Sequence, residues 1–535
     1  MSATPNTYAQ NLSMIRQNPA LLSSLALLHR GIEKESLRVT PTGKLAQTGH
    51  PLSLGSALCH PKITTDYSEA LLEFITPVRN SVDGALGDLE ATHRFTYQML
   101  ANQQEVLWPA SMPCQLGEEK DIPVARYGNS NVATMKTIYR VGLGHRYGRQ
   151  MQTISGIHYN FSLSERFWAN YQRLLDNTEG HDQFKTEHYF HLIRNFRRYV
   201  PLFVYLFGAS PALCRSFLKG GQPHNLSQFD EHTWYGPHST SLRMGDLGYS
   251  SSAQEKIYIC YNSLDDYIQS LRKAITEPHE AYENIGLKNA DDDYQQLNTS
   301  LLQIENEFYS TIRPKRVAAS GEAPINALAR AGVEYIEVRC IDINPFLPMG
   351  IDSGEIQFLD LFLLYCLFQP SPAFVGEDFE RCQRNLKKVV AEGRDPALEI
   401  EALSTDNRPI TGFIDWASHL LDDMRPLAEL LDTLHAGTPF QTILLMQRKK
   451  LDDPSLTPSQ QILASMQSNG QTFAEFMGHQ AKHWQSHFCG DSLSDKALAQ
   501  HQALAADSIA KQATIESADN MAFDAYLQDF YQQYR

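Results

Sequence analysis

The sequence has few cysteines, and none of them is arranged to hold a structural metal or a disulfide framework. Eight cysteines are scattered over 535 residues, and the nearest two, Cys366 and Cys382, are separated by fifteen residues. This spacing excludes a recognisable zinc knuckle and a dense disulfide scaffold. Isolated cysteines are typical of proteins from a reducing compartment, so we expect a cytoplasmic protein.

Basic residues are also fewer than acidic ones, and the chain contains no apolar run long enough to span a membrane. Lys and Arg number 46 against 61 Asp and Glu, which gives a net charge of −15. Nucleic-acid-binding proteins carry a basic face, so we expect no nucleic-acid partner. Two uncharged stretches, 199–214 and 361–376, contain prolines and fall short of the roughly 18–20 apolar residues of a membrane span. We interpret both as buried core segments, and we expect no membrane association and no secretory signal.

Several catalytic motifs are missing as well. The chain has no G-x-x-x-x-G-K-[ST] and no G-x-S-x-G, which excludes a P-loop enzyme and removes support for a nucleophilic serine. The glycine-containing segment 142–150 does not match a dinucleotide-binding fingerprint. Hydrophobic residues make up 42 % and charged residues 20 % of the chain, a composition that is ordinary for a globular protein and excludes disorder.

What the chain does contain divides into two parts. From about residue 30 to 350, short strand-like runs alternate with Gly, Pro, Asn and Asp, and segments near 186–200 and 255–280 are predicted to be helical. From about 355 onward, apolar residues recur at three- and four-residue spacing, which predicts helices over 359–368, 379–393, 413–434 and 522–534. This grouping predicts an α+β architecture. We place the boundary between a core, residues 1–354, and a helical C-terminal region, residues 355–535.

The first strand-like run carries a pair of carboxylates. In GIEKESLRV, residues 31–39, alternation places Glu33 and Glu35 on the same face. They would lie about 6.5–7 Å apart along the backbone. For this pair alone, a solvated strand face is the simpler explanation.

The second run places a carboxylate in apolar surroundings. In ITTDYSEALLEFITP, residues 63–77, Asp66 ends one strand-like stretch, and Glu73 lies inside a second one, which we predict to be a strand that ends at Pro77. A buried carboxylate is rarely tolerated unless it is paired or binds metal. A structural salt bridge and a metal site explain Glu73 equally well.

Two further runs add an imidazole and a third set of charges. In SGIHYNFSL, residues 155–163, His158 shares a polar face with Asn160 and Ser162, although a single histidine is more often structural than a ligand. In GVEYIEVRCIDINPF, residues 332–346, Glu337 and Arg339 share a face. A plain ion pair explains them, and so does a phosphate site in which the glutamate holds a metal and the arginine contacts phosphate oxygens.

Taken together, the four runs predict an oxygen-rich face on one sheet. Hard cations take carboxylates and water as ligands, so such a face would suit Mg²⁺ or Mn²⁺. Basic residues gather near it in sequence, although a solvated surface is the default explanation for each group. They are Arg313 and Lys315 in IRPKR, Arg243 in TSLRMGDLGYS, and Arg140 after Tyr139 in TIYRVGL.

These runs belong to a longer series of segments with a family resemblance. In order along residues 30 to 350, the series resembles the signature blocks of the bacterial glutamate–cysteine ligases of the proteobacterial group, also called γ-glutamylcysteine synthetases. One departure is Cys340, where the family usually has Ser, on the strand face opposite Glu337 and Arg339. The blocks read RGIEKESLRVTPTGKLAQTGHPLSLGSAL, ITTDYSEALLEFITP, MQTISGIHYNFS, LFGASPA, TSLRMGDLGY, QIENEFYSTIRPKR and YIEVRCIDINPF.

The resemblance implies a fold and a reaction. The fold would be glutamine-synthetase-like, a curved antiparallel sheet flanked by helices. The reaction would join L-glutamate to L-cysteine with ATP, the first step of glutathione biosynthesis. The γ-carboxylate would first be phosphorylated and the cysteine amine would then displace phosphate, because a carboxylate is unreactive towards amines. We expect a monomer or a weak oligomer with small molecules as its partners.

The resemblance also implies roles for individual residues. Arg339 would contact ATP phosphates, with Arg313 and Lys315 also assigned to the nucleotide. Arg243 would lie near the transferred phosphoryl group and the acyl substrate, which makes it a catalytic candidate together with Arg339. Alternation along the strands, considered without the resemblance, also selects five of the implied site residues, and it gives no information on the tyrosines. The five are Glu33, Glu35, His158, Glu337 and Arg339. The implied metal ligands are Glu33, Glu35, Asp66, Glu73, His158 and Glu337, and the implied substrate-pocket residues are Tyr139, Arg140, Arg243, Tyr249 and Tyr309.

Three other functions remain open at this level. A related ligase could join glutamate to another amine, a di-metal hydrolase could use the same acids to activate water, and a nucleotide sensor could retain a degenerate site. The complete set of acids and arginines argues against degeneration. A bifunctional enzyme with an added glutathione synthetase module would need a longer chain.

Overall fold

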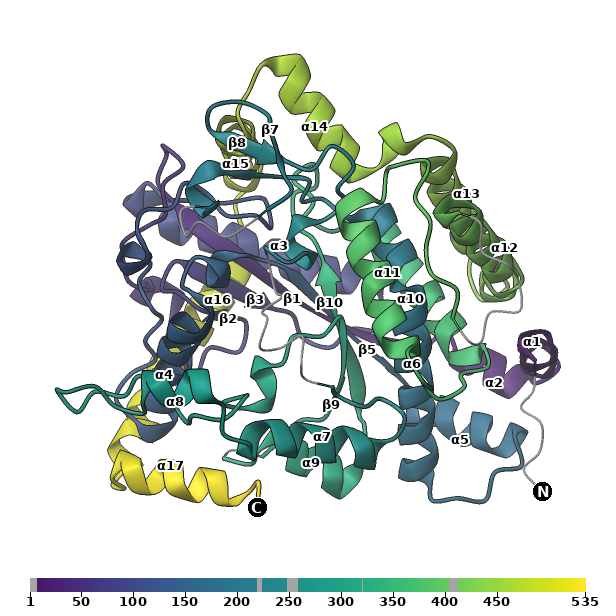
Figure 1. Ribbon diagram of the computed structural model, residues 1–535, viewed down its shortest axis with the longest axis horizontal. Helices are drawn as coiled ribbons and strands as arrows, with labels where there is room; N and C mark the ends of the chain where they lie inside the picture. The colour runs from purple at the N-terminus through teal and green to yellow at the C-terminus, as the bar shows by residue number, and fades with distance from the viewer. Residues whose placement is uncertain (1–6, 219–223, 248–257, 320, 404–411) are drawn as a thin grey trace.

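The computed structural model describes residues 7–218, 224–247, 258–319, 321–403 and 412–535. Its centre is a seven-stranded antiparallel sheet in the order β2-β3-β1-β5-β10-β9, with β4 paired to β1 (Figure 1). The strands of this sheet are β1 Leu28–Val39, β2 Ile63–Thr65, β3 Leu71–Ile75, β4 Val106–Leu107, β5 Ile157–Leu163, β9 Ile312–Lys315 and β10 Tyr335–Ile341. A smaller sheet is formed by β6 Ala212–Cys214, β7 Ser227–Gln228 and β8 Thr233–Tyr235.

Helices surround this sheet and make up almost all of the C-terminal part. In chain order they are α1 Tyr8–Arg16, α2 Pro19–Ser24, α3 Val82–Leu100, α4 Asn131–Tyr147, α5 Glu165–Leu174, α6 His181–Phe207, α7 Leu264–Thr276, α8 Glu280–Ile285, α9 Pro324–Ala331, α10 Ser353–Phe368, α11 Asp378–Glu392, α12 Phe413–Asp432, α13 Pro439–Asp452, α14 Pro458–Asn469, α15 Phe473–Gly490, α16 Asp495–Ala518 and α17 Phe523–Gln532. The predicted α+β class and the predicted helical tail are therefore confirmed.

One face of the large sheet is covered by three helices. Helix α3 packs on β1 and β3, α6 packs on β9 and β10, and α10 lies against both helices. Asp360 of α10 accepts hydrogen bonds from Tyr159 of β5 (2.6 Å) and from the guanidinium of Arg30 of β1. This buried network holds α10 against the two central strands, so the opposite face of the sheet is the one that remains for polar groups.

The predicted elements differ from the observed ones mainly at their ends. The run 63–77 forms two short strands with a turn between them, and the second strand ends at Ile75 rather than at Pro77. Helix α6 extends beyond the segment near 186–200 that was predicted to be helical and continues through Pro201, and part of the helix predicted near 255–280 falls outside the described residues. In the described part of the chain, no helix is long and apolar enough to cross a membrane.

The division at residue 354 stays a prediction. The boundary falls in the first turn of α10, a helix of the covering layer. A single cluster of buried apolar side chains extends from Leu12 to Tyr534, so both parts contribute to the same core.

The covered face of β1 contains a buried lysine. Lys34 is 3 % exposed, and its Nζ lies 2.8 Å from Nε2 of His93 in α3. Burial lowers the pKa of Lys34 to about 7. The unfolded chain, in which lysine has a pKa of about 10.4, therefore binds more protons than the folded protein between these two values.

We expect this lysine to make folding stability depend on pH. The stability of the wild type should rise from about pH 7 to about pH 10, with a slope of at most ~1.4 kcal/mol per pH unit for one proton. In Lys34→Met this rise should disappear, so the difference in unfolding free energy between variant and wild type should shift in favour of the wild type over this range. Denaturant titrations at several pH values would measure it. Lys449→Met, on the exposed surface of α13, is the control, and an identical slope in wild type and Lys34→Met would contradict the prediction.

Candidate active site

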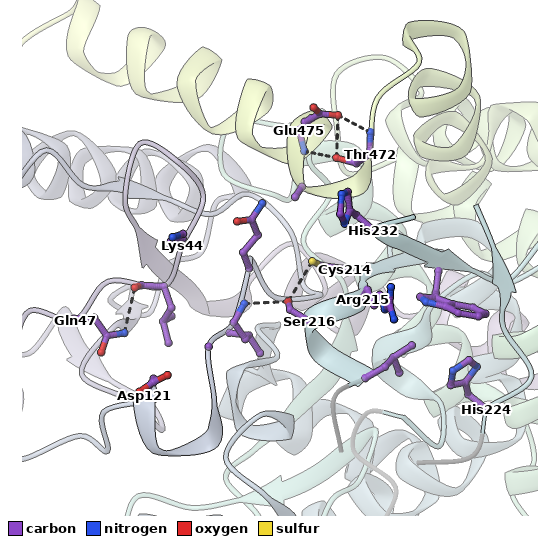
Figure 2. A pocket seen from close by; sticks show the side chains of 17 residues that line it. Lys44, Gln47, Asp121, Cys214, Arg215, Ser216, His224, His232, Thr472 and Glu475 are labelled. Carbon is purple, nitrogen blue, oxygen red and sulfur yellow. Dashed lines mark hydrogen bonds between the residues drawn. The ribbon is translucent and has the colours of Figure 1, made fainter. Parts of the chain in front are cut away.

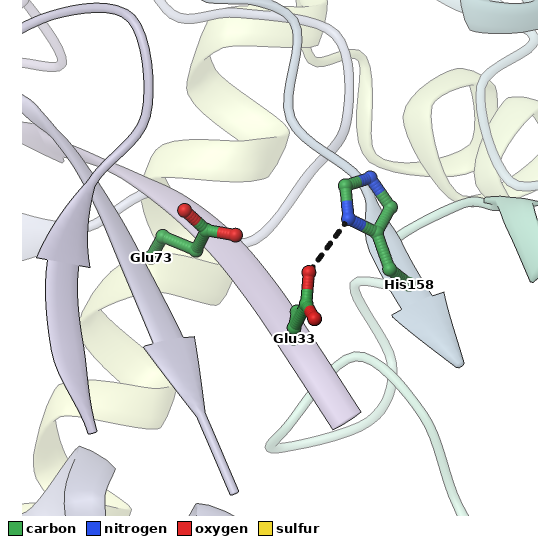
Figure 3. A group of neighbouring side chains, drawn as sticks. All are labelled: Glu33, Glu73 and His158. Atoms are coloured by element: carbon green, nitrogen blue, oxygen red, sulfur yellow. Dashed lines mark hydrogen bonds and ion pairs between the residues drawn. The ribbon is translucent and has the colours of Figure 1, made fainter. Parts of the chain in front are cut away.

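Strand register brings the predicted metal ligands together on the open face of the sheet. Glu33 of β1 lies opposite His158 of β5, and Glu35 of β1 lies opposite Glu73 of β3. Figure 3 shows the side chains of Glu33, Glu73 and His158, from three different strands, pointing towards one another. One oxygen or nitrogen atom from each lies within 4.8 Å of the others. This is the spacing at which a single cation can be shared.

Two of the remaining predicted ligands lie beside the same histidine, and the third lies near Glu35 and Glu73. Glu337 Oε1 lies 3.7 Å from His158 Nδ1, and Glu35 Oε1 lies 3.8 Å from His158 Nε2. Asp66, at the end of β2, is close enough for its charge to raise the pKa of both Glu35 and Glu73. The structure therefore brings all six predicted ligands into one cluster, although their role as ligands stays a prediction.

The electrostatics of this cluster favour a bound cation. Burial, and then the charges of Glu33, Asp66 and Glu35, raise the pKa of Glu73 well above its usual range. Burial and then Asp66 raise the pKa of Glu35 to about 8. A divalent cation would relieve this repulsion, since hard cations bind carboxylates directly. Burial and the charge of Arg339 lower the pKa of His158, which favours the neutral imidazole that can act as a ligand.

A basic rim borders the acids at β9 and β10. Nη1 of Arg339 lies 3.0 Å from Oε1 of Glu337, and Nζ of Lys315 lies 3.1 Å from Oε2 of the same carboxylate. Although burial acts to raise the pKa of Glu337, these cations and His158 outweigh it, and the pKa is held well below its usual range. Both basic residues are placed where they could contact a phosphate held by the cluster.

Arg313 is placed differently from the other two members of this basic group. It lies opposite Glu337 in register, but its guanidinium is buried and donates to the carbonyl oxygens of Asn306 and Phe308. Its assignment to the nucleotide stays a prediction, and the observed contacts show that it holds the 306–308 loop.

Arg243 reaches the cluster from outside the sheet. It is 1 % exposed, and its Nη2 donates to the carbonyl oxygen of Arg339 (2.7 Å). The guanidinium lies against Gly156, whose N–H donates to Oε2 of Glu35 (2.6 Å). Asp342 lies 3.8 Å from Nη1 of Arg243 and also accepts from Ala209 N–H (2.8 Å) and from the Ser241 hydroxyl (3.0 Å), so it joins three chain segments behind the arginine.

The predicted substrate-pocket residues lie beside α4 and the loop before β9. The hydroxyl of Tyr309 is 3.3 Å from Oε1 of Gln152, and Asp66 and Arg339 both influence its pKa, which burial raises. Arg140 donates to the carbonyl oxygen of Asp66. Tyr139 is close enough to Tyr309 for the two phenols to influence each other. Tyr249 lies outside the described residues.

Sequence reasoning missed three residues that support this site. Gly156 directly precedes β5 and Asp342 directly follows β10, and no sequence pattern distinguishes either residue from its neighbours. Gln152 contacts Tyr309 from a short 3₁₀ turn, Met151–Thr153. Asn160 was noted only as a member of a polar face, and its Nδ2 donates to Oε1 of Glu33 (2.8 Å). Strand alternation could find Asn160, but it could not find residues that act from loops.

A large cavity lies elsewhere. It has a volume of about 1190 Å³ and is bordered by the loops around Lys44 and Asp121, by β6 and β8, and by the start of α15 (Figure 2). None of the predicted site residues lines it. We place the active site at the acidic cluster because that is where the chemically reactive groups converge, and cavity size alone does not identify chemistry.

The chain was also compared with known proteins. A family model described as "Glutamate-cysteine ligase" matches residues 12–389. A glutamate–cysteine ligase of Alcanivorax borkumensis is 50 % identical over 96 % of this chain and 97 % of its own length. One from Saccharophagus degradans is 49 % identical over 95 % and 94 %.

Solved structures agree with these sequence matches. The crystal structure of a glutamate–cysteine ligase from Francisella tularensis, in complex with AMP, superposes with a TM-score of 0.88 at 34 % identity, over 94 % of this chain and 97 % of that one. A bifunctional glutathione synthetase from Pasteurella multocida shares the fold, with a TM-score of 0.72 at 24 % identity over 92 % of this chain and 58 % of that one.

Proposed function

The chain belongs to the glutamate–cysteine ligase family, and from this premise we propose how the open face of its sheet carries out the ligation. The protein joins L-glutamate to L-cysteine with ATP as co-substrate, which forms γ-glutamylcysteine for glutathione synthesis. The observation that supports our assignment of this chemistry is the register of β1, β3, β5 and β10, which collects four carboxylates and His158 within one cluster beside Arg339 and Lys315.

We propose that the cluster holds Mg²⁺ or Mn²⁺ with Glu33, Glu35, Asp66, Glu73, His158 and Glu337 as ligands. Such ions neutralise the charge that develops on the transferred phosphoryl group. The fit rests on the mutual repulsion of Glu73, Glu35 and their neighbours, which a cation would relieve. The neutral imidazole of His158 adds the nitrogen ligand.

The protein's own groups then account for positioning. Arg339 and Lys315 border the cluster at Glu337, where they would bind phosphate oxygens of ATP. Arg243, beside Glu35, would orient the glutamate γ-carboxylate and stabilise the negative charge on the oxygens of the phosphoryl group as it is transferred. The resulting γ-glutamyl phosphate would be attacked by the cysteine amine, held at the end of the site where Tyr139, Arg140, Tyr309 and Tyr249 are proposed to line a pocket. We also propose a cytoplasmic monomer or weak oligomer that binds no nucleic acid.

Replacing Arg339 by lysine should test the phosphate contact. A guanidinium can make two parallel hydrogen bonds to phosphate, whereas an ammonium is a compact point charge. We expect Arg339→Lys to lower kcat/KM for ATP about tenfold, a loss of ~1.4 kcal/mol of transition-state stabilisation, with an unchanged thermal midpoint. Steady-state kinetics with ATP varied would measure it. Wild-type kinetics would reassign Arg339 to the scaffold.

The reaction itself is tested by its products. ADP formation should require both glutamate and cysteine and should match dipeptide formation one to one. ADP formed without any amine requirement would instead support a hydrolase.

The acyl phosphate makes a separate prediction about inhibition. A glutamate-like sulfoximine with a cysteine-sized alkyl group should be phosphorylated on nitrogen, because it resembles the species formed when the amine attacks γ-glutamyl phosphate. Since a site complementary to the transition state binds such mimics far more tightly than substrates, inhibition should develop slowly and require ATP and metal. Progress curves with and without ATP would measure it, and rapid inhibition that ignores ATP would rule out the acyl-phosphate order.

A further inference from the structure

The last helix of the chain lies at the amine end of the proposed site. Figure 1 shows α17 beside α4, on the opposite side of the molecule from α12 and α13. We propose that α17 and the residues that follow it form a positioning element for the amine-acceptor pocket, with Tyr531 in the helix and Tyr534 just after it as the positioning residues. This inference rests on the proposed role of Tyr139 and Tyr309 in that pocket.

The first connection runs from Tyr531 to Tyr139 through one glutamine. The Tyr531 hydroxyl donates to the backbone carbonyl of Gln303 (2.9 Å). The side chain of Gln303 in turn donates to the carbonyl of Tyr139 in α4 (3.2 Å) and accepts from the N–H of Leu297 (2.9 Å). The Tyr531 hydroxyl therefore fixes the backbone of Gln303, and the side-chain amide of Gln303 bridges α4 and the segment that contains Leu297.

The second connection runs through Tyr534. Its hydroxyl donates to the carboxylate of Glu305, whose other oxygen accepts from the N–H of Ile325 (2.8 Å) at the start of α9. Next to it, Gln533 accepts from Ala323 N–H (2.8 Å), and its carbonyl accepts from Asn326 Nδ2 (3.0 Å). The C-terminus thus closes the gap between the 303–307 segment and α9.

Buried groups relay this restraint towards the site. The N–H of Gln303 donates to Glu307, whose carboxylate also accepts from the Tyr147 hydroxyl (2.7 Å) and from Nη1 of Arg146 (2.9 Å). Glu307 and Arg146 are fully buried. Tyr309 follows two residues later and reaches Gln152 (3.3 Å). A loop fixed at Gln303 and Glu307 leaves little freedom for the position of Tyr309.

Apolar packing makes the attachment of α17 specific. One face of the helix packs on Met135 and Ile138 of α4, on Leu297 and on Tyr139 itself. Leu527, in the middle of that face, is 6 % exposed. The face consists of Phe523, Tyr526, Leu527, Phe530 and Tyr531. Tyr139 packs against this same cluster, so α17 is linked to a proposed pocket residue by shared apolar packing as well as by the hydrogen bonds through Gln303.

The test replaces tyrosines by phenylalanine in the 535-residue chain, so that each substitution removes one hydroxyl group. Tyr531→Phe and Tyr534→Phe keep the aromatic rings and remove the hydroxyl contacts. These are the contacts of Tyr531 with the Gln303 carbonyl and the Asn298 side chain, and that of Tyr534 with Glu305. Tyr526→Phe is the matched control, since within the described part of the chain its hydroxyl makes no hydrogen bond. The readouts are the KM values for cysteine, glutamate and ATP, the ratio of ADP to dipeptide, and the thermal midpoint.

We expect the double variant Tyr531→Phe/Tyr534→Phe to raise the KM for cysteine about tenfold, as the loss of one to two net hydrogen bonds would. The KM values for glutamate and ATP should stay within about twofold, since the two hydroxyls contact Asn298 and the segment 303–305 and not the strands β9 and β10 that carry Lys315 and Arg339. ADP should exceed dipeptide, because slower amine capture leaves the activated glutamate to water. Tyr526→Phe should match the wild type.

The outcomes separate this inference from the proposed function. A lower thermal midpoint with an unchanged KM for cysteine would make α17 a purely stabilising helix and overturn the inference. An equal rise in all three KM values would overturn it as well. If the wild-type protein forms no γ-glutamylcysteine, the proposed function fails first, and the variants need not be compared.

Discussion

Glu73→Gln is expected to remove nearly all ligase activity while it raises the thermal midpoint of the metal-free protein. The two effects have one cause, the position of Glu73 among Glu33, Asp66 and Glu35. With a cation bound, the carboxylate would be one of its proposed ligands, and its loss should lower kcat by about 10³-fold, at the upper end of what one electrostatic group contributes. Without a cation, its charge is repelled by its neighbours, and the neutral amide relieves that repulsion.

The stability effect should depend on pH in a defined direction. Burial and the surrounding charges raise the pKa of Glu73 well above its usual range. A group whose pKa is raised on folding stabilises the folded state below the unfolded value of about 4.3, and this stability is lost as pH rises through the folded value. The thermal midpoint of Glu73→Gln relative to wild type, measured with a chelator present, should therefore increase as the pH rises above the unfolded value of about 4.3.

Metal addition provides the reverse test. Mg²⁺ should raise the thermal midpoint of the wild type more than that of Glu73→Gln. An ion that binds only the folded state stabilises it in proportion to its affinity, and the variant lacks one of the proposed metal-binding carboxylates. Glu90→Gln, a carboxylate on α3 paired with Arg94, should leave activity and the metal response unchanged. A large fall in the midpoint of Glu73→Gln, with or without metal, would instead identify Glu73 as half of a structural ion pair.

Gly156→Ala is expected to lower kcat by about 10²-fold with the fold intact, since misplacing one electrostatic group costs this order of rate. A β-carbon at this position would overlap the guanidinium of Arg243, with its Cζ only 2.6 Å away. Gly156 is not among the glycines with positive φ, so alanine is compatible with the backbone and the clash is the whole effect. Arg243 is 1 % exposed and held by Arg339 and Asp342, so the guanidinium can avoid the clash only by leaving its position beside Glu35.

A matched glycine and a double-mutant comparison make this prediction specific. Gly87 lies in α3, and a β-carbon added there would meet no other group within 4 Å, so Gly87→Ala should keep full activity. If Gly156→Ala acts through the arginine, it should cause little further loss in an Arg243→Lys background, because effects on one interaction are not additive. Fully additive losses, or wild-type kinetics in Gly156→Ala, would contradict the role assigned to Arg243.

Much of the candidate site could be predicted because its residues lie on regular strands. Alternation along a strand is a local property of the extended backbone, so it placed Glu33 with Glu35 and Glu337 with Arg339 before any contact was known. The assignment of Asp66 and Glu73 stayed equivocal from the residues alone. Their relation depends on the turn that splits 63–77 into β2 and β3, and a carboxylate inside an apolar run fits a salt bridge as well as a metal.

The sequence by itself determined the class of the fold, the strand faces and the family, since periodicity and signature blocks are readable residue by residue. Only the tertiary structure decided which faces meet. The pairing of Glu33 with His158 and of Glu35 with Glu73 depends on the register between strands. The approach of Arg243 over Gly156, and of Tyr531 in α17 to the carbonyl of Gln303, joins segments far apart in the chain. Such contacts are set by the packing of the whole core, which no local pattern encodes.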